Sequence, residues 1–515
     1  MKADSSPPVS RRNWKEVVTS DLGMLAIFAF GNVLIHTLAN GQYGFHRDEL
    51  LTYNNARHLQ WGYAVYPPVT AFFGRLSLVL FGTSLRGFRL FAAMAQGLAM
   101  LLTGLAAREM GGRREAQLVS AFAAALCGVS LVHGSFTSYT AFDFPCWILV
   151  AYFVIRLLKS DDPRWWLAIG AAIGLGMMTK YTMAFLVLGV VGGVLLTPVR
   201  RHLKSPWLWL GAAVALFVFL PNLLWQIHNH FVTLDCIRTI HARDVSHGST
   251  DHFLLNQFWS TTNIVTVPIW CAGLWFLFVA PEGKRYRLLG WMYVIPLAAF
   301  LFAKGRNYYL AAAYPMLFAA GAVWGEQCLS SLSACFALVV RRIVWRSMAI
   351  SGLCSIAVTL PFAPVNSRWW HIADRMNGGN FNMQVGWPDM VEEVAQIRDS
   401  LPPADKATLG IMAGDEGETG AINLYGPAYG LPRAISGMNS NWMRGYGDPP
   451  PQTLMVLGEH RDFVEQNFES CTLAGRVTNR YGIANDAVAS WGDIFVCRRL
   501  RWPWPAFWQH FRYYG

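Results

Sequence analysis

The sequence has few charged residues. Only 14% of its 515 residues are Asp, Glu, Lys or Arg, whereas 54% are hydrophobic. Soluble domains carry close to a quarter charged residues, so this composition excludes an ordinary soluble protein and indicates a chain embedded in lipid. The formal charge of +11 does not predict a nucleic-acid partner, because Lys and Arg come in small clusters between apolar runs and form no single basic face.

The sequence also lacks the short motifs of several enzyme classes. It has no Walker A sequence and no Rossmann glycine fingerprint, which argues against ATP- or NAD-driven chemistry. No Cys or His pair has zinc-ligand spacing, so we expect neither a metal nor another cofactor; a metal role for His228 and His230 is the alternative. Of nine Cys, Cys471 and Cys497 alone fall in the predicted outer domain, where a disulfide is possible.

Long apolar runs dominate residues 21–361. A lipid-spanning helix needs roughly 20 apolar residues, and the runs predict about 11 crossings. Val69–Phe81 is also apolar, but its length of about a dozen residues is typical of an interfacial or re-entrant helix. No small-residue cleavage site follows the first run, which we interpret as a retained span and not a signal peptide. The runs are 21–38, 86–107, 116–133, 141–158, 166–179, 182–197, 206–227, 259–280, 287–303, 308–325 and 347–361.

Basic residues mark alternate loops. Under the positive-inside rule this pattern places the N-terminal segment 1–20 in the cytoplasm, and an odd number of crossings places residues 362–515 outside. We therefore expect a multi-pass protein of the plasma (inner) membrane, with extracytoplasmic loops at 40–87 and 228–258 that contribute to an extracytoplasmic active site. The basic clusters are Lys2, Arg11, Arg12 and Lys15; Arg108, Arg113 and Arg114; Arg156, Lys159 and Arg164; Arg200, Arg201 and Lys204; Lys284, Arg285 and Arg287; and Arg341, Arg342 and Arg346.

Acidic residues stand at two places on the predicted outer side. Asp48 and Glu49 begin a short amphipathic helix in the first outer loop. A carboxylate in the first turn of a helix interacts favourably with the helix dipole, and this structural explanation fits Glu49 better than Asp48. Asp143 opens a hydrophobic helix, where it either caps that helix or shares a membrane-surface cavity with Asp48.

Cations on the same side break the positive-inside pattern. Lys180, Lys304 and Arg306 are ionisable groups near lipid and are therefore functional candidates, with snorkelling of the lysines as the alternative. Arg306 precedes two tyrosines, and its planar guanidinium suits a phosphate. Two acids with several cations suggest a carboxylate that deprotonates or orients an acceptor hydroxyl while cations hold a phosphate leaving group. A lipid-linked phosphosugar donor fits this pattern.

Three ordered motifs, Asp48–Leu50, Tyr66–Pro68 and Thr179–Tyr181, resemble those of the family 39-type membrane glycosyltransferases with the GT-C fold. The resemblance covers roughly residues 20–325 and implies inverting transfer of one sugar from a polyprenyl-phosphate donor to an envelope lipid, glycan or protein. Asp48 is then the acid–base candidate and Asp143 the second-loop acid, while Lys180 and Arg306 face the donor phosphate. The full candidate site comprises catalytic Asp48, Glu49 and Asp143; donor-phosphate-binding Lys180, Lys304, Arg306 and Tyr309; and substrate-binding Arg47, Tyr53 and Tyr66.

The C-terminal residues 362–515 lack apolar spans. Helical patterns at Met390–Ser400 and Asp462–Phe468 and strand patterns at Ala407–Ala413 and Thr453–Leu457 predict a small α/β domain. Gly430–Trp442 is interpreted either as a carbohydrate-facing loop or as an ordinary connection. The predicted fold class is a multi-span α-helical membrane protein, GT-C-like with about 11–13 helices, that carries a C-terminal extracytoplasmic α/β domain.

Two other functions share the many spans and the charges. A secondary transporter or lipid flippase would place ionisable residues mid-span and show repeated halves, and no repeat is detected. A non-catalytic scaffold would leave the acidic pair Asp48–Glu49 unexplained. The ends of helices, where Asp48, Asp143, Lys180 and Arg306 are predicted, favour the transferase.

Overall fold

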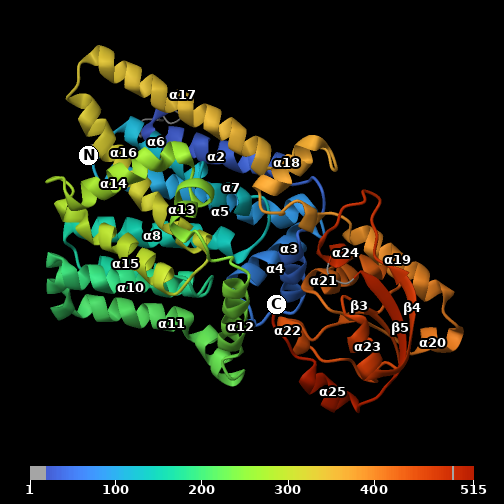
Figure 1. Cartoon of the computed structure of the whole chain (residues 1–515). Coiled ribbons are helices and arrows are strands. Elements are labelled where there is room, and N and C mark those ends of the chain that lie inside the picture. The colour runs from blue at the N-terminus through green and yellow to red at the C-terminus, as the bar shows by residue number, and fades with distance from the viewer. Residues whose placement is uncertain (1–18, 490–491) are drawn as a thin grey trace, which may run out of the picture.

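The computed structural model describes residues 19–489 and 492–515 of the chain. An α-helical bundle occupies the blue to yellow part of Figure 1, and a smaller domain with a β-sheet, in orange and red, lies against one end of the bundle. Of the predicted N-terminal segment 1–20, only Thr19 and Ser20 fall within the described residues. The fold class is the predicted one, a helical membrane protein with a small C-terminal sheet domain.

Every apolar run corresponds to a helix or to a broken pair of helices. The run 116–133 is interrupted between Ala125 and Gly128. At Gly128 the missing side chain lets Ser260 approach, since a Cβ there would lie 2.6 Å from the Ser260 carbonyl oxygen. The helices of the bundle are α2 (Asp21–Ala39), α3 (Arg47–Arg57), α4 (Val69–Phe81), α5 (Leu85–Glu109), α6 (Arg114–Ala125), α7 (Gly128–His133), α8 (Tyr139–Ser160), α9 (Trp165–Met177), α10 (Met183–Leu196), η1 (Pro198–Lys204), α11 (Pro206–His228), α12 (Val232–Ser246), α13 (Phe253–Asn256), η2 (Gln257–Thr261), η3 (Ile264–Thr266), α14 (Val267–Phe278), η4 (Lys284–Tyr286), α15 (Arg287–Phe302), η5 (Asn307–Ala313), α16 (Tyr314–Ser330) and α17 (Ala334–Thr359).

Fewer helices than predicted are long enough to cross a membrane unaided. By length and composition four of the described helices qualify (α2, α5, α8 and α11), and up to six spans result if each of two bent helix pairs counts as one. The prediction of about 11 crossings came from apolar composition, but several runs form short helices, such as α9 with 13 residues. Others are broken, since the helices on either side of residues 262–263 meet at 100°.

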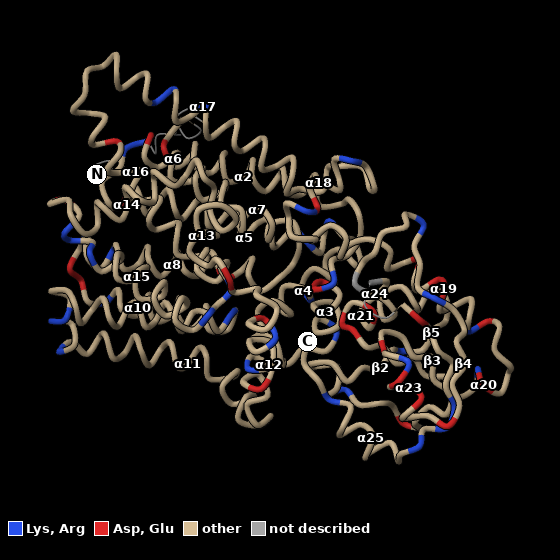
Figure 2. The backbone as a smooth tube through the Cα atoms, in the orientation of Figure 1, with Lys and Arg blue, Asp and Glu red and all other residues tan. Residues whose placement is uncertain are grey.

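The predicted basic loops meet at one end of the bundle. Ion pairs connect them: Glu109 at the end of α5 binds Lys159 at 2.9 Å, and Glu115 of α6 binds Arg341 at 2.7 Å. Asp161, after α8, pairs with Arg201 of η1. In Figure 2 blue Lys and Arg positions gather at the left-hand bundle end, away from the C-terminal domain. Basic loops therefore lie at one end of the bundle, and the loops between them in the sequence lie at the other end.

The C-terminal domain is built on a five-stranded mixed sheet with the order β2-β1-β3-β5-β4. β1 is parallel to β2 and β3, whereas β5 is antiparallel to β3 and β4. The predicted strands are present as β1 and β3, and the predicted helices as α19 and α23. The elements are α18 (Arg368–Met376), η6 (Asn382–Gln384), α19 (Trp387–Ser400), α20 (Pro403–Ala407), β1 (Leu409–Ala413), α21 (Glu416–Tyr425), η7 (Gly426–Tyr429), β2 (Ala434–Ile435), α22 (Asn439–Trp442), β3 (Thr453–Leu457), α23 (Arg461–Asn467), β4 (Phe468–Arg476), α24 (Asp486–Ala489), β5 (Asp493–Leu500) and α25 (Trp504–His510).

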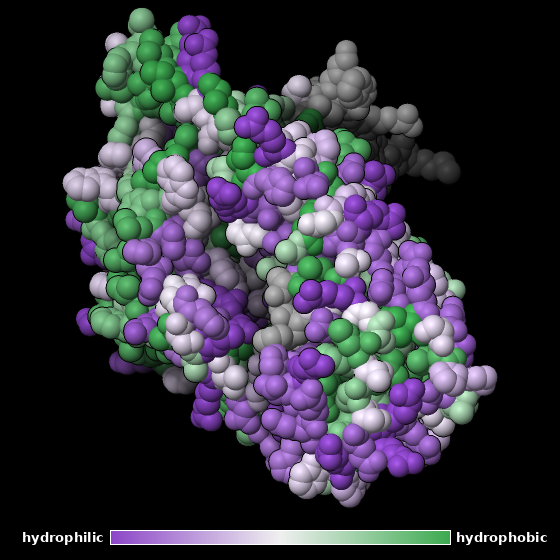
Figure 3. Space-filling view, turned by 45° about the vertical axis from the view of Figure 1, so that its right-hand side comes forward, coloured by the Kyte–Doolittle hydropathy of each residue, from purple (hydrophilic) through white to green (hydrophobic). Residues whose placement is uncertain are grey.

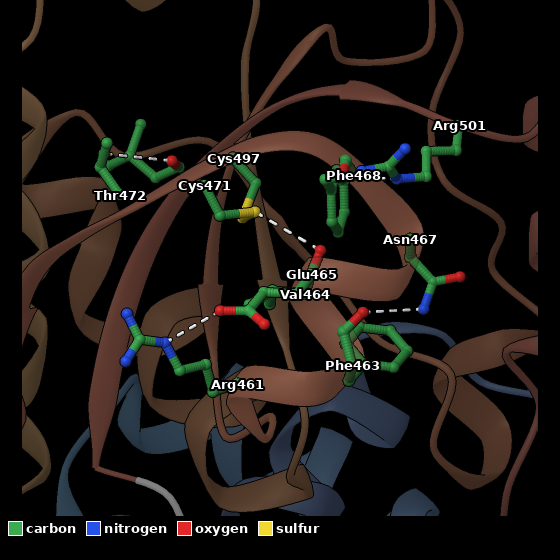
Figure 4. Close-up of a disulfide and its surroundings, with 11 residues drawn as sticks. Arg461, Phe463, Val464, Glu465, Asn467, Phe468, Cys471, Thr472, Cys497 and Arg501 are labelled. Carbon is green, nitrogen blue, oxygen red and sulfur yellow. Dashed lines mark hydrogen bonds and ion pairs between the residues drawn. A yellow bond between two sulfur atoms is a disulfide. The ribbon is translucent and has the colours of Figure 1, made fainter.

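Helices cover both faces of this sheet. Side chains alternate along each strand, so neighbouring residues of one strand pack against helices on opposite faces. Met412 and Val456 pack toward α23 and α25, while their neighbours Ile411 and Met455 pack toward α19 and α21. Figure 4 shows Cys471 and Cys497, from the paired strands β4 and β5, close to α23. Their sulfur atoms are joined in a disulfide, the pairing that the sequence left open.

The helix α3 contributes side chains to the core of the bundle and to the core of the C-terminal domain. Leu50 and Tyr53 of α3, with Phe88 of α5, lie in the same buried cluster as Ile411 and Met455 of the sheet. Gly420 of α21 allows this close packing, since a Cβ there would lie 2.5 Å from the Leu50 Cβ. The C-terminal domain is therefore packed onto the bundle through α3.

A buried ion pair fixes α3 in the bundle. Arg89 of α5 binds the Glu49 carboxylate at 2.7 Å, and both side chains are fully buried. Arg89 also donates to the carbonyl oxygens of Asn40 and Gly44, at 3.2 and 2.7 Å. Glu49 accepts from the backbone N–H groups of His46 and Thr137, each at 2.9 Å. These bonds satisfy both buried charges, as a stable buried pair requires.

Removing one partner of this pair should destabilise the protein strongly. Glu49→Ala leaves the Arg89 guanidinium buried without its counter-charge, and we expect a loss of about 3–5 kcal/mol in the free energy of unfolding. The measurement is unfolding of the purified protein in detergent, followed by Trp fluorescence. Arg461→Ala, which breaks an exposed ion pair with Glu465, is the control and should change stability by about 0.5 kcal/mol or less. Equal effects of the two substitutions would contradict the assignment.

Candidate functional site

A cavity of about 450 Å³ lies between the bundle and the C-terminal domain. It is at the bundle end opposite the basic loops, because α8 begins beside it at Tyr139 and ends among those loops at Ser160. Figure 3 shows a hollow between the bundle, where green hydrophobic residues are prominent, and the largely purple C-terminal domain. Six predicted site residues line the cavity besides Asp48: Arg47, Tyr66, Lys180, Lys304, Arg306 and Tyr309.

Asp48 points into this cavity from the first turn of α3. The helix start is fixed by a capping box, in which His46 Nδ1 accepts from the Asp48 backbone N–H at 3.1 Å and Glu49 reaches back to the His46 N–H. The Asp48 side chain is 40% exposed and lies 3.7 Å from Arg47. Burial raises the pKa of Asp48, but electrostatic interactions with His46, Arg47 and Arg306 outweigh it and hold the pKa below its ordinary value. Asp48 is therefore ionised at neutral pH and can accept a proton.

Glu49 does not line the cavity. Its carboxylate oxygens are occupied by Arg89 and by backbone N–H groups, and it has no exposed surface. The first-turn position suggested an interaction with the helix dipole, whereas the structure shows a capping box and a buried ion pair with Arg89. Glu49, a catalytic candidate from the sequence, therefore has no access to the cavity. Its ion pair orients α3, on which Asp48 is carried.

Asp143 lies inside α8, five residues into the helix, and Ser138 occupies the N-cap position. Its two oxygens accept from Trp147 Nε1 at 2.9 Å and from Thr182 Oγ1 at 3.1 Å. Asp143 is buried and does not line the cavity. It stands behind Lys180, with which it interacts electrostatically.

Lys180 reaches the cavity through a cage of aromatic rings. Its ammonium nitrogen lies 5.1, 5.0 and 4.8 Å from the ring centres of Tyr139, Tyr308 and Tyr309, and it donates to Thr140 Oγ1 at 3.2 Å. Ring faces stabilise a desolvated cation. The cage therefore holds a positive charge at a defined position near lipid.

Arg306 is paired with a carboxylate that the sequence did not single out. Its Nε and Nη2 donate to the two oxygens of Asp244 at 2.5 and 2.7 Å, in the two-pronged geometry typical of Arg. Asp244 belongs to α12, which lies within the predicted loop 228–258. Lys304, two residues before Arg306, lines the cavity and forms no ion pair with any residue of the described ranges.

The two tyrosines that were predicted in the first outer loop lie in different surroundings. Tyr66 lines the cavity, and its hydroxyl accepts from Asn55 Nδ2 at 2.8 Å. Tyr53 instead packs into the core shared with the sheet, and its hydroxyl accepts from Arg57 Nη1 at 3.1 Å. Tyr53 is therefore on the opposite side of α3 from the cavity lining.

Two groups of residues that line the cavity were not predicted from the sequence. Ile237, Ile240 and Asp244 line the cavity from α12 and recur at helical spacing, a signal that was present within the predicted loop. Asp415 and Glu416, at the start of α21, line it from the C-terminal domain, and nothing local connects them to Asp48. Among residues 19–489 and 492–515, no three His, Cys, Asp or Glu side chains gather closely enough to hold a metal ion.

Sequence comparisons match part of the chain to known glycosyltransferases. Residues 65–225 match the family model of dolichyl-phosphate-mannose-protein mannosyltransferases. The chain is 26% identical to lipid A galacturonosyltransferase RgtD of Rhizobium johnstonii, over 52% of this chain and 57% of that protein. It is 30% identical to undecaprenyl phosphate-alpha-4-amino-4-deoxy-L-arabinose arabinosyl transferase 1 of Sodalis glossinidius, over 49% of this chain and 48% of that protein. The matches thus span about half the length of these curated relatives.

Solved structures match over more of the chain. ArnT from Cupriavidus metallidurans, bound to undecaprenyl phosphate, superposes with a TM-score of 0.58 at 16% identity, covering 93% of this chain and 98% of that one. The archaeal oligosaccharyltransferase AglB from Archaeoglobus fulgidus gives a TM-score of 0.53 at 11% identity, covering 86% and 70% of the two chains. The protein is therefore an integral membrane protein with the GT-C fold, the architecture of the membrane glycosyltransferases that it resembles.

Proposed function

We propose that the protein is an inverting glycosyltransferase, which moves one sugar from a polyprenyl-monophosphate donor to an envelope lipid, glycan or protein at the outer face of the membrane. The observation that carries the proposal is the cavity itself, in which the ionised Asp48 shares one space with Lys180, Lys304 and Arg306. The relatives named for undecaprenyl-phosphate chemistry and the undecaprenyl phosphate bound to ArnT support the donor class.

The three cations suit the phosphate of the donor. A sugar phosphodiester carries one negative charge, and the released polyprenyl phosphate monoester approaches two at neutral pH. Cations placed where charge develops lower the barrier to its formation. Lys180, Lys304 and Arg306 come from two neighbouring segments of the cavity wall and therefore define the phosphate position.

The apolar part of the same wall suits the lipid tail. Phe185 of α10 and Phe300 of α15 line the cavity with ring centres 4.2 Å apart. These helices pack on each other and lie next to each other in Figure 1. A polyprenyl chain that leaves the cavity along α10 and α15 keeps its isoprene units in apolar surroundings.

Asp48 supplies the base. The acceptor hydroxyl loses its proton to the Asp48 carboxylate as its oxygen bonds to the anomeric carbon from the face opposite the phosphate. The bond between that carbon and the phosphate oxygen breaks, and its electron pair stays on the phosphate. Attack from the opposite face inverts the configuration at the anomeric carbon.

The placement of the charges favours this function over transport. Transporters carry their ionisable residues near the bilayer midplane, whereas the charged groups around this cavity lie at one end of the bundle. The opposite end carries the basic loops, and by the positive-inside rule we assign that end to the cytoplasm. The cavity and the C-terminal domain are then extracytoplasmic.

Replacing the base tests the mechanism. Asp48→Asn keeps the side-chain size but cannot accept a proton, and we expect transfer to fall by at least about a hundredfold, with unchanged insertion and unfolding temperature. The measurement is release of polyprenyl phosphate from a panel of radiolabelled polyprenyl-phosphate sugars. Asp235→Asn, at an exposed carboxylate of α12, is the matched control and should stay active. Retained turnover in Asp48→Asn would remove Asp48 from this role.

Arg306 should be needed for donor binding. We expect Arg306→Ala to weaken polyprenyl-phosphate binding about tenfold, and Lys at this position to restore it only partly, because Lys lacks the two-pronged donor geometry. Binding is measured by Trp fluorescence titration, with the exposed Arg285→Ala at the opposite end of the bundle as the control.

Turnover should survive EDTA, since the proposed charge neutralisation uses side chains. Loss of turnover in EDTA that a divalent cation restores would count against this scheme.

Reporter fusions test the proposed orientation of the protein in the membrane. Alkaline phosphatase fused after Gly515 should be active and a fluorescent protein fused there should be dark, because the first folds only outside the cytoplasm and the second only inside it. A fusion between Ser160 and Arg164, in a basic loop, should give the reverse result and controls for expression. A fluorescent fusion after Gly515 would overturn the topology.

A further inference from the structure

The C-terminal domain supplies one wall of the cavity. Asp415 and Glu416 at the start of α21, together with Met438, face the residues of the bundle across it. The proposed chemistry uses only groups of the bundle, so this wall has no role in it so far. Asp415 has a local structural function, since its carboxylate accepts from the Gly417 N–H at 2.6 Å and caps α21.

Glu416 has no such local function. Its side chain is buried, with 8% of the residue exposed, and its Oε1 accepts from Asn439 Nδ2 at 2.7 Å. Oε2 accepts no hydrogen bond from any residue that the structure describes, and Glu416 is one of the residues that line the cavity. A carboxyl group that lines a cavity and has one oxygen without a protein partner can form a hydrogen bond with a bound polar molecule.

The position of Glu416 relative to Asp48 is rigid. α21 packs directly on α3, with Gly420 against Leu50 and a hydrogen bond of 3.0 Å from Asn423 to Asn54. Ser440, next to the Asn439 that holds Glu416, accepts from the Ala64 N–H at 2.9 Å. The two carboxyl groups are thus carried on helices that share one core, and their separation does not depend on a mobile loop.

The proposed phosphate-binding cations and Glu416 lie on different walls of the cavity. Lys180, Lys304 and Arg306 lie on the bundle side, and Glu416 lies on the domain side. In an inverting displacement the attacking oxygen, the anomeric carbon and the leaving phosphate oxygen lie nearly in line. A phosphate held by the bundle cations therefore places the acceptor on the side of the C-terminal domain.

We propose that Glu416 binds a hydroxyl group of the acceptor and orients its attacking oxygen toward Asp48. This inference rests on the proposed function and adds a binding site for a hydroxyl-bearing acceptor, formed by α21 of the C-terminal domain. Glu416 binds substrate but exchanges no proton with the reacting oxygen, which remains the task of Asp48.

The ionisation of Glu416 agrees with a neutral, hydroxyl-bearing ligand. Burial raises its pKa to about 8, with Asp415 and Asp48 adding to this effect and Asn439 and Arg47 opposing it. The carboxyl group is therefore largely protonated at neutral pH, and can both donate and accept a hydrogen bond. Such a group matches a sugar or lipid hydroxyl better than it matches a cation.

The test separates acceptor binding from donor chemistry. Full-length protein in detergent is given a radiolabelled polyprenyl-phosphate sugar, first with washed cell envelopes as the acceptor and then with water alone. Glu416→Ala should raise the amount of envelope needed for half-maximal transfer about tenfold, the value of one lost hydrogen bond. Donor hydrolysis in water and the Kd for undecaprenyl phosphate should stay within about twofold of wild type.

Two further variants control for folding. Glu416→Gln keeps the shape, a donor and an acceptor, and should recover most of the transfer, whereas Glu459→Gln changes a carboxyl of the same domain outside the cavity lining and should have no effect. Unchanged transfer by Glu416→Ala, or an equal fall of transfer and hydrolysis, would overturn the proposal for Glu416. A wild-type protein that turns over no donor in either assay would overturn the proposed function itself.

Discussion

The shape of the cavity depends on the ion pair between Arg89 and Glu49. Two opposite charges without any exposed surface are stable only if every donor and acceptor finds a partner, because an uncompensated charge in such surroundings costs several kcal/mol. Arg89 meets this demand with carbonyl oxygens at the end of α2 and with the Gln384 side chain of the C-terminal region, at 3.2 Å. One guanidinium therefore fixes α2, α3, α5 and the start of the C-terminal domain relative to each other, and the orientation of Asp48 follows from that of α3.

The C-terminal domain is a structural part of the site. Its core continues into α3 through Leu50 and Tyr53, and Arg444 donates to the Asn55 side chain of the same helix. A helix shared by two cores cannot move with one part alone, so the cavity keeps its shape as long as both parts stay packed. In the proposed reaction this preorganisation places base, phosphate-binding cations and acceptor wall without a closing step.

Local patterns predicted the features that depend on local physics. Apolar runs gave the helices, and compact apolar stretches gave β1 and β3, since burial of these elements is encoded in consecutive residues. β4 was not predicted, because it lies at the sheet edge and most of its side chains are exposed. The charges at one end of the bundle were predicted from the alternation of basic loops.

Pairings between distant residues were not predictable in this way. Glu49 meets Arg89 40 residues later, and Arg306 meets Asp244 62 residues earlier. Tyr53 and Tyr66 looked equivalent in one loop, and only the packing of α3 on the sheet separates a core residue from a cavity residue. Glu416 joins the cavity through tertiary contacts that have no counterpart in the surrounding sequence.

The pairing of Arg306 with Asp244 has an energetic consequence for turnover. Asp244 already neutralises the guanidinium, so in the proposed reaction a phosphate that binds Arg306 replaces one anion by another. Such an exchange releases much less free energy than the capture of an unpaired guanidinium, since the carboxylate bonds are lost as the phosphate bonds form. In the proposed reaction, Asp244 competes with the released lipid phosphate for the same guanidinium. In that scheme the ion pair limits the affinity of the cavity for the donor and for the released lipid phosphate alike.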